Sequence, residues 1–294
     1  MQPDASNNVI LVGPARSGTT LACSLLNDPV VANTAALDEP YDRDMLAAVS
    51  SERFLPFVEA QFHRFRRMLV EEGEAVSTVG DHGLSNHYDS LCSETGLRER
   101  VVSAGRVRLN KALDADCRLA VKHTIPFTAM LEPLRSRYPV YAIVRNPVAV
   151  LASWNSIDAA YRNGAPPRYA AHLCGDMPWL INAVRDRFER QVVLLAWHFE
   201  QYLPLLRDGK VIRYEDMIDS GGRALGIVSA NAGNLSAQLA NQNYVNFCDP
   251  ELIAQINISL HRLGGVIWEF YDRKEVDGLS AFFTEGRSEV RQRK

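Results

Sequence analysis

Long apolar stretches are missing from this sequence of 294 residues. The longest uninterrupted one, residues 192–197, is far shorter than the roughly 18 residues that would suggest a bilayer-spanning helix. The opening MQPDASNN contains neither the basic segment nor the apolar segment of a secretory signal. We therefore expect a soluble, cytoplasmic protein without a membrane span.

Cysteine is scarce, and neither sign of charge is in large excess. The five cysteines are widely spaced and include no C-x-x-C pair, so nothing favours a disulfide framework or a zinc site, and no metal is expected. A formal net charge of −3 argues against a nucleic-acid partner, because duplex nucleic acid selects strongly basic surfaces. The net charge does not exclude that one local pocket binds a small anion.

Short apolar runs alternate with helical patterns along the chain. This alternation predicts an α/β fold whose central, mostly parallel sheet is flanked by helices on both faces. In such sheets ligands bind at the carboxyl ends of the strands. The predicted strands are residues 9–12, 30–32, 119–122, 140–144 and 211–214, and the predicted helices are residues 21–26, 51–72, 127–137, 147–155 and 178–206.

The motifs described below spread over most of the chain, which favours one domain over residues 1–294. Two segments, at about 40–110 and 157–180, are expected as largely helical insertions on the acceptor side of that domain. Within the first of them, residues 73–100 are mixed and polar and are expected to form loops with short helices. The part from about 220 to 285 is expected to be helical.

The segment Gly13–Gly18 has the spacing G-x-x-x-x-G between a predicted strand and a predicted helix. Backbone N–H groups of such a loop, together with the helix N-terminus, can bind a phosphate. The Walker A motif would next require Lys, but Thr19 stands there, and the cation lies inside the loop at Arg16. The loop therefore favours a phosphate ligand over the chemistry of ATP. A ligand-free glycine turn is the alternative.

The residues Pro14 to Leu21 resemble the 5′-phosphosulfate loop of sulfotransferases that use 3′-phosphoadenosine 5′-phosphosulfate (PAPS). The resemblance implies a P-loop NTPase-like sulfotransferase fold, PAPS as co-substrate and PAP as product. It also implies that the residues binding the 5′-phosphate end are Arg16, Ser17, Gly18, Thr19 and Thr20.

Two further segments support the resemblance. Arg145-Asn146-Pro147, with Ser153 on the following predicted helix, resembles the 3′-phosphate motif of the family, in which a guanidinium and a hydroxyl bind one phosphate. Its alternative is a capped helix with a surface arginine. The segment 211–217 resembles the family's R-Y-E-D-[LM] sequence, which implies that Tyr214 lies against the adenine. A buried strand followed by an acidic turn describes that segment equally well.

Sulfuryl transfer needs cations on the transferred group, an in-line acceptor and a base for the acceptor proton. Arg16 and Lys122 are the predicted cations. Cytosolic aryl and steroid sulfotransferases have a His base two residues after that Lys, whereas His123 follows Lys122 directly. A shift of one place turns a strand side chain to the opposite face of the sheet, which argues against His123 as the base.

The chain resembles more closely the tyrosylprotein and bacterial carbohydrate sulfotransferases, which have Arg in the first loop and a Glu shortly after the second strand. Glu39 fits that place and is the predicted base, with Asp38 and His123 as alternatives. A carboxylate base would need burial to raise its pKa toward working pH. A helix cap is the alternative role of the segment 38–40. The histidines without a partner pattern are expected on the surface or in the core: His63, His82, His87, His172, His198 and His261.

The acceptor is expected to be a hydroxyl, less favourably an amine, of a small molecule or a glycan, and a homodimer is left open. Loops over a rigid nucleotide scaffold usually set such specificity. The residues that could line the acceptor wall are Phe54, Phe57, Asp81, His82, Asn86, His87, Tyr88, Tyr161, Tyr169 and Trp179. The competing hypotheses are a P-loop-like kinase or nucleotide-binding protein that lacks the Walker lysine, and a non-catalytic binding module.

Overall fold

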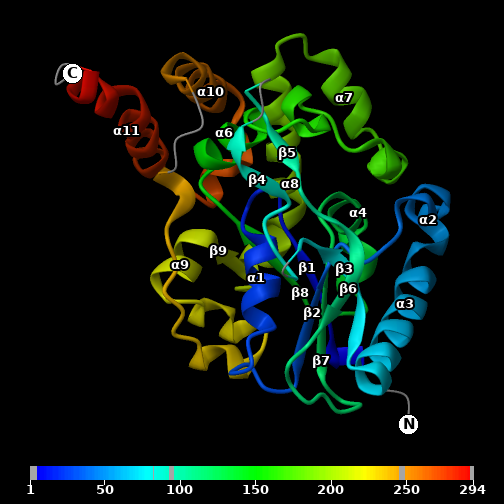
Figure 1. The fold of residues 1–294 in the computed structure, drawn as a ribbon. Helices are drawn as coiled ribbons and strands as arrows, with labels where there is room; N and C mark the ends of the chain where they lie inside the picture. Colours follow the sequence, from blue (N-terminus) through cyan, green and yellow to red (C-terminus); the bar gives the residue numbers. More distant parts are fainter. Residues whose placement is uncertain (1–4, 82, 93–95, 245–248, 292–294) are drawn as a thin grey trace.

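The computed structural model describes residues 5–81, 83–92, 96–244 and 249–291. At its centre lies a sheet of five strands in the order β2-β7-β1-β8-β9, every neighbouring pair parallel (Figure 1). The predicted α/β class and parallel sheet are therefore confirmed. The strands are β1 (Asn8–Val12), β2 (Thr34–Asp38), β7 (Arg118–Lys122), β8 (Val140–Val144) and β9 (Val211–Arg213).

Both faces of the sheet are buried. Val9 and Leu11 of β1 pack with α1 (Thr19–Leu26) and α9 (Tyr214–Asp219) on one face. Ile10 and Val12, which alternate with them, face the larger core on the other side. Because neither face meets water, the strands are continuous apolar runs rather than alternating ones. The helices over the second face include α3 (Ser51–Glu72), α4 (Ile125–Ala129), α5 (Leu131–Arg135), α6 (Pro147–Asn155), α8 (Arg187–Arg207), α10 (Pro250–Leu263) and part of α11 (Arg273–Arg291).

The order of the strands reverses between β1 and β8. From β1 the chain runs through α1 to β2 at one edge of the sheet, whereas from β8 it runs through α6 and α8 to β9 at the other edge. Two neighbouring strands whose connections leave in opposite directions open a crevice at their carboxyl ends, which is where ligands bind in sheets of this kind. The loop 13–18 and Arg145 both lie at this point.

The insertion at about 40–110 contains strands that the sequence patterns did not predict. After α2 (Arg43–Ala48) and α3, β3 (Glu74–Val79) pairs antiparallel with β6 (Ser103–Arg108), and β4 (Tyr88–Cys92) pairs with β5 (Arg98–Arg100). The expectation of loops with short helices over residues 73–100 is therefore wrong. The alternation in β3 buries small residues, Ala75 and Ser77, and so escapes a search for large apolar side chains.

Three predicted elements also differ in the structure. Residues 30–32 form a turn in which Val30 is 53% exposed, and the strand begins only at Thr34. The helix predicted over 127–137 is divided into α4 and α5, because Pro133 has no N–H to bond with the carbonyl of the residue four places earlier.

The helix predicted over 178–206 is also two helices, α7 (Met177–Ala183) and α8. Asp186 starts α8 by accepting a hydrogen bond from the Glu189 N–H at 2.9 Å, a cap that marks a new helix. Within the described ranges, no helix combines the length and apolarity that a membrane crossing requires.

Candidate functional site

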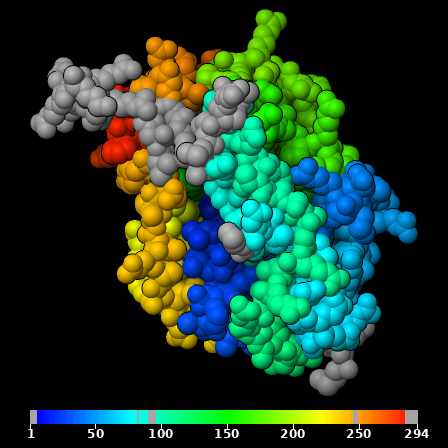
Figure 2. All heavy atoms as spheres, viewed as in Figure 1, coloured from blue at the N-terminus to red at the C-terminus, as the bar shows by residue number. Residues whose placement is uncertain are grey.

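A pocket of about 880 Å³ lies at the carboxyl ends of the strands. Figure 2 shows α1 at the surface between the insertion on one side and the segment after α9 on the other. The pocket is strongly cationic, although the whole chain has a net charge of −3. Seven cationic and three acidic side chains line it: Arg16, Arg43, Arg98, Arg100, Lys122, Arg145 and Arg168 against Glu39, Asp44 and Asp158.

The loop after β1 is shaped by two glycines that admit no side chain. A Cβ on Gly13 would stand 2.4 Å from the Ile143 carbonyl oxygen. Gly18 has φ of 95°, and a Cβ there would stand 2.6 Å from the Tyr214 ring. The loop thereby brings the start of α1 to the pocket, where Thr19 and Thr20 line the wall. The first N–H groups of a helix have no partner within it, so they are available to an anion.

Ser17, one of the predicted cofactor-binding residues, does not line this pocket. Its side chain is fully buried, and its hydroxyl has no hydrogen-bond partner within the described part of the chain. The hydroxyl lies against the backbone of Gly13, only 2.7 Å from where a Cβ on that glycine would stand. Ser17 therefore packs inside the loop rather than facing a ligand.

Arg16 links the loop to two distant segments. Its backbone has a left-handed φ of 74°, a conformation that costs energy for a residue with a side chain. Its Nε donates to Ser153 Oγ at 3.0 Å and its Nη1 to Asn86 Oδ1 at 2.7 Å. Removal from water, together with Arg98 and Arg145, lowers the pKa of Arg16 to about 9. An anion placed here would relieve that repulsion.

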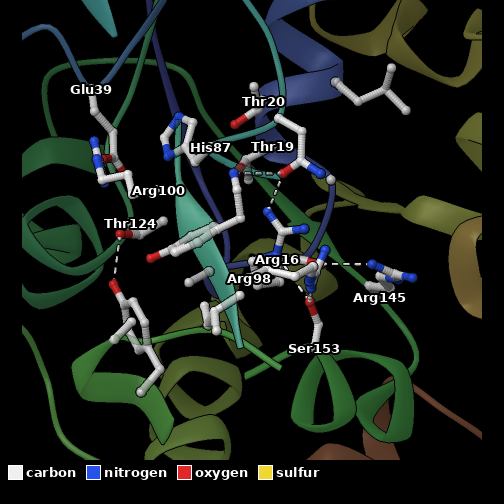
Figure 3. Close-up of a pocket in the computed structure, with 18 of the residues that line it drawn as sticks. Arg16, Thr19, Thr20, Glu39, His87, Arg98, Arg100, Thr124, Arg145 and Ser153 are labelled. Atoms are coloured by element: carbon white, nitrogen blue, oxygen red, sulfur yellow. Dashed lines mark hydrogen bonds between the residues drawn. The ribbon is translucent and has the colours of Figure 1, made fainter. Parts of the chain in front are cut away.

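Three guanidinium groups gather around Ser153 (Figure 3). Besides the bond from Arg16, Ser153 Oγ accepts one from Arg98 Nη2 at 3.1 Å. Arg145 Nη1 donates to the Arg16 carbonyl oxygen at 3.1 Å, and burial lowers the pKa of Arg145. The predicted pair of Arg145 and Ser153 is thus brought to one pocket. Arg98, only 3% exposed on the short strand β5, is a member of this cluster that the sequence patterns did not reveal.

Residues that follow β9 in the chain contact Arg145 and its neighbour Asn146. The Tyr214 ring lies 4.6 Å from the Arg145 guanidinium carbon and also packs against Gly18. Glu215 accepts hydrogen bonds from the Asn146 N–H at 3.0 Å and from Asn243 Nδ2 at 2.7 Å. Asn243 Oδ1 in turn accepts from Arg145 Nε at 2.6 Å. Tyr214 thus lines the pocket, and its contact with an adenine stays a prediction. Glu215 lies in the first turn of α9, with a side chain 14% exposed.

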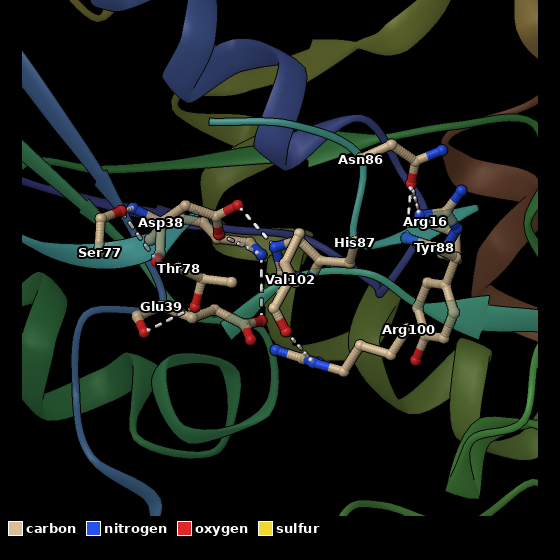
Figure 4. Close-up of polar contacts among 11 residues, drawn as sticks. Arg16, Asp38, Glu39, Ser77, Thr78, Asn86, His87, Tyr88, Arg100 and Val102 are labelled. Atoms are coloured by element: carbon tan, nitrogen blue, oxygen red, sulfur yellow. Dashed lines mark hydrogen bonds and ion pairs between the residues drawn. The ribbon is translucent and has the colours of Figure 1, made fainter. Parts of the chain in front are cut away.

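Lys122 lies between the carboxylates of Asp38 and Glu39, whose side chains are labelled in Figure 4. Asp38 and Lys122 are partners in the register of β2 and β7. The Lys122 ammonium is 2.8 Å from Asp38 Oδ1 and 3.1 Å from Glu39 Oε1, and its side chain is 3% exposed. Glu39 has a left-handed φ of 44°, which its N–H bond to the Lys122 carbonyl oxygen at 2.9 Å helps to hold.

These contacts decide the protonation of the predicted base. Burial alone would raise the pKa of Glu39, but the Lys122 ammonium outweighs burial and lowers it to about 2. In the same way Lys122 holds the pKa of the fully buried Asp38 below its usual range, and the two carboxylates raise the pKa of Lys122. A carboxylate base needs burial to raise its pKa toward working pH. Glu39 is held the other way, because the Lys122 cation is buried beside it.

Two histidines have different places from those expected. His87 is not an isolated surface or core residue, since its Nε2 lies 2.9 Å from Asp38 Oδ2 and it lines the pocket. His123 is outside the lining of the pocket. It accepts a hydrogen bond from the Tyr41 N–H at 3.3 Å and packs against Phe127, and burial lowers its pKa to about 4. The structure thus does not bring His123 to the pocket with Glu39 and Lys122, whereas the next residue, Thr124, lines it.

The two inserted segments form much of the pocket wall, as predicted. Of the expected acceptor-side residues, those that line the pocket are Asn86, His87, Tyr88, Tyr161 and Tyr169. Phe54 and Phe57 pack with the core, Trp179 is 70% exposed outside the pocket, Asp81 does not line it either, and His82 lies outside the described residues.

A search among the described residues finds no group of three or more His, Cys, Asp or Glu side chains placed to hold a metal ion. No protein-family model matches the chain, and a search of curated protein sequences finds no match. The function must therefore be argued from the pocket itself.

Proposed function

We propose that the chain is a sulfotransferase that moves a sulfuryl group from PAPS to a hydroxyl of a small-molecule or glycan acceptor. It would adopt the P-loop NTPase-like sulfotransferase fold and belong with the members that have Arg in the first loop and a Glu base. One observation carries the proposal: part of the loop 13–20, the pair Arg145 and Ser153, and the pair Lys122 and Glu39 line one pocket. The residues of the loop that line it are Ala15, Arg16, Gly18, Thr19 and Thr20. The loop and the two pairs are far apart in the sequence and meet where the strand order reverses.

In this proposal the nucleotide lies across the cationic side of the pocket. The 5′-phosphate accepts hydrogen bonds from the N–H groups at the start of α1 and from Thr19 and Thr20. Arg145 and Ser153 bind the 3′-phosphate. Arg98 joins them, because it already donates to Ser153 Oγ and a fork of N–H groups suits phosphate oxygens.

The transfer itself replaces one S–O bond by another. The acceptor hydroxyl gives its proton to a Glu39 carboxylate oxygen, and its oxygen forms a bond to sulfur as the bond from sulfur to the 5′-phosphate oxygen breaks. PAP leaves with the bonding electron pair. Arg16 and Lys122 stabilise the charge on the transferred group and on the leaving oxygen, which is where electrostatic catalysis acts most strongly.

Lys122 also controls how basic Glu39 is. An ammonium has three N–H donors, and Asp38 and Glu39 are partners for two of them. When a sulfuryl oxygen accepts a hydrogen bond from the Lys122 ammonium, the ion pair between Lys122 and Glu39 weakens. The pKa of the Glu39 carboxyl then rises from about 2 toward working pH. The same cation thus stabilises the transferred group and releases the base.

The test is a transfer assay with PAPS labelled in its sulfate, incubated with fractions of a cell extract. Label is expected to move to an acceptor in the presence of the protein, with release of PAP. Glu39→Gln is the matched control, because it keeps the shape of the side chain and removes its basicity. Absence of any labelled product, in fractions where PAPS itself remains intact, would count against the proposal. Equal transfer by Glu39→Gln would remove Glu39 as the base.

A further inference from the structure

Three cations of the pocket remain without a role once the nucleotide has been placed. Arg43 is the first residue of α2, Arg100 the last residue of β5, and Arg168 the first residue of the short 3-10 helix η3 (Arg168–Leu173). All three are exposed, and the described residues offer none of them an ion pair. Unpaired arginines lining a pocket favour an anionic ligand.

Two of these arginines, Arg43 and Arg100, line the same pocket as the proposed base. Figure 3 shows Arg100 beside Glu39, on the side of the pocket away from Arg145, and Figure 4 also shows Arg100 near Glu39. Arg43 lies over the Tyr169 ring, with its guanidinium carbon 5.4 Å from the ring centre. Both segments belong to the acceptor-side insertions rather than to the strands that carry the phosphate loop.

The charges of Glu39, Arg43 and Arg100 also act on two tyrosines of the pocket wall, Tyr88 and Tyr169. Burial raises the pKa of Tyr169, Glu39 raises it further, and Arg43 and Arg100 oppose both effects. Burial also raises the pKa of Tyr88, with Arg100 and Arg43 again acting against it. Tyr88, Tyr169, Arg43, Arg100 and Glu39 therefore form one electrostatic group around the place where the acceptor hydroxyl must lie.

We infer that the acceptor carries an anionic group close to the hydroxyl that receives the sulfuryl group, and that Arg43 and Arg100 bind this group. A carboxylate, a sulfate ester and a phosphate ester all offer the oxygens that guanidinium groups prefer. Tyr88 and Tyr169 supply flat faces for the ring that bears the hydroxyl. The inference rests on the proposed function, since it assumes that PAPS occupies the other side of the pocket.

Calorimetry on protein loaded with PAP tests the inference. Glucuronate, glucose 6-sulfate and glucose 6-phosphate are each compared with glucose, and 4-hydroxybenzoate is compared with 4-hydroxybenzamide. We expect at least one anionic compound to bind about tenfold or more tightly than its neutral partner, the minimum expected for a hydrogen-bonded charge pair. The three glucose derivatives show which anionic group is preferred.

The double variant Arg43→Gln/Arg100→Gln is expected to reduce that preference to less than about threefold, because it removes the charges but keeps polar side chains. Arg53→Gln is the control, since Arg53 is exposed on α3 and does not line the pocket. Each variant should bind PAP as the unchanged protein does.

The inference is overturned if anionic and neutral compounds bind equally, if no anionic compound binds, or if the preference survives the double variant. PAP is titrated alone first. Failure at that step refutes the proposed function, and the inference with it, whereas failure at the second step refutes the anionic acceptor only.

Discussion

At the residue scale, Lys122 is the side chain on which the proposed chemistry depends most. Its ammonium is shared by Asp38 and Glu39 at 2.8 and 3.1 Å, in a place that is 3% exposed. Asp38 is further held by His87 at 2.9 Å, so it stays an anion that positions Lys122. Glu39, with a side chain 14% exposed, is the carboxylate of the pair that a ligand can reach.

This arrangement predicts which residue is the base. Glu39→Gln is expected to lower the rate of sulfate transfer at least about a hundredfold, the usual contribution of a general base. His123→Phe is expected to keep transfer within about threefold, because His123 packs between Tyr41 and Phe127 and its loss removes one hydrogen bond of about 1 kcal/mol. Transfer rates are measured beside thermal melting curves. Loss of transfer in a well-folded His123→Phe, with Glu39→Gln active, would reverse the assignment.

At the element scale, the loop between β1 and α1 depends on Gly18. Its φ of 95° and the nearby Tyr214 ring leave no room for a Cβ. Gly18→Ala is expected to cost about 2 kcal/mol or more of unfolding free energy, from backbone strain and the displaced ring, and to weaken PAP binding.

Gly233→Ala is the matched control, because a Cβ at Gly233 would meet nothing within 4 Å. Denaturant unfolding and PAP titration of both variants check the prediction. Comparable stability and PAP affinity in the two variants would show that the shape of the loop is not what binds the phosphate.

The strand β5 brings Arg98 from the insertion into the cluster around Ser153. Arg98 Nη2 donates to the Oγ atoms of Ser153 and Ser156, and its backbone N–H donates to the Ser156 carbonyl oxygen at 2.8 Å. Arg98→Gln is therefore expected to weaken PAP binding about tenfold or more, as loss of a charged hydrogen bond to phosphate does. Glu99→Gln, an exposed neighbour, should leave PAP affinity unchanged. Calorimetry compares the two, and an unaltered affinity in Arg98→Gln would place the 3′-phosphate elsewhere.

The strands of the central sheet differ in how well the sequence predicts them, because some are strongly apolar and one consists of small residues. The runs at 9–12 and 140–144 are strongly apolar, and a loop with glycines at fixed spacing follows the first. The core of the sheet and the glycine loop between β1 and α1 could therefore be predicted from the sequence. The strand Thr34–Asp38 was missed because small residues form it, while the β-branched Val30 lies in a turn. Its register beside β7, which pairs Asp38 with Lys122, follows from strand order and not from any local pattern.

Arg98 and His87 are two residues of the site that the sequence patterns do not predict. Each stands in or beside a short strand of the insertion, where few apolar residues mark the structure. Each reaches the site only because distant segments pack together: Arg98 through α6 and His87 through the end of β2. No spacing within the sequence carries that information.

At the scale of the whole molecule, the distribution of ionisable groups predicts how stability depends on pH. Burial lowers the pKa of His123 to about 4 and that of His198 to about 3, from an ordinary value of 6.5. Lys122 overrides burial to lower the pKa of Glu39 to about 2. For each lowered pKa the unfolded chain binds more protons than the folded one as pH falls. The stabilisation is therefore complete above about pH 6.5 and is lost progressively below it.

The melting temperature is accordingly expected to fall as pH is lowered from 7 to 4, beginning near pH 6.5 with the histidines and continuing as the carboxylates titrate. Each unit of pKa difference corresponds to about 1.4 kcal/mol at full effect. His123→Phe should flatten the first part of the decline. Calorimetric melting at a series of pH values measures this. A melting temperature that is constant or rises from pH 7 to pH 5 would contradict the burial of neutral histidines.

The chain as a whole is slightly acidic, yet it concentrates seven cationic side chains around one pocket. Such a pocket attracts a multiply charged small anion without making the protein a general polyanion binder. A phosphate on each end of an adenosine fits this arrangement, with Thr19 and Thr20 at one end and Arg98, Arg145 and Ser153 at the other. A nucleoside triphosphate would instead place all of its phosphates at the loop 13–20, where Thr19 occupies the position of the Walker lysine.

Titration of the metal-free protein with PAP, ATP and adenosine 5′-phosphosulfate decides whether the pocket binds a 3′,5′-bisphosphorylated adenosine. PAP is expected to bind at least about tenfold more tightly than ATP, and Arg145→Ala is expected to weaken PAP far more than adenosine 5′-phosphosulfate, which has no 3′-phosphate. Tighter binding of ATP, above all with a requirement for Mg²⁺, would support the kinase-like alternative. Equal weakening of PAP and adenosine 5′-phosphosulfate in Arg145→Ala would contradict the assignment of the 3′-phosphate site.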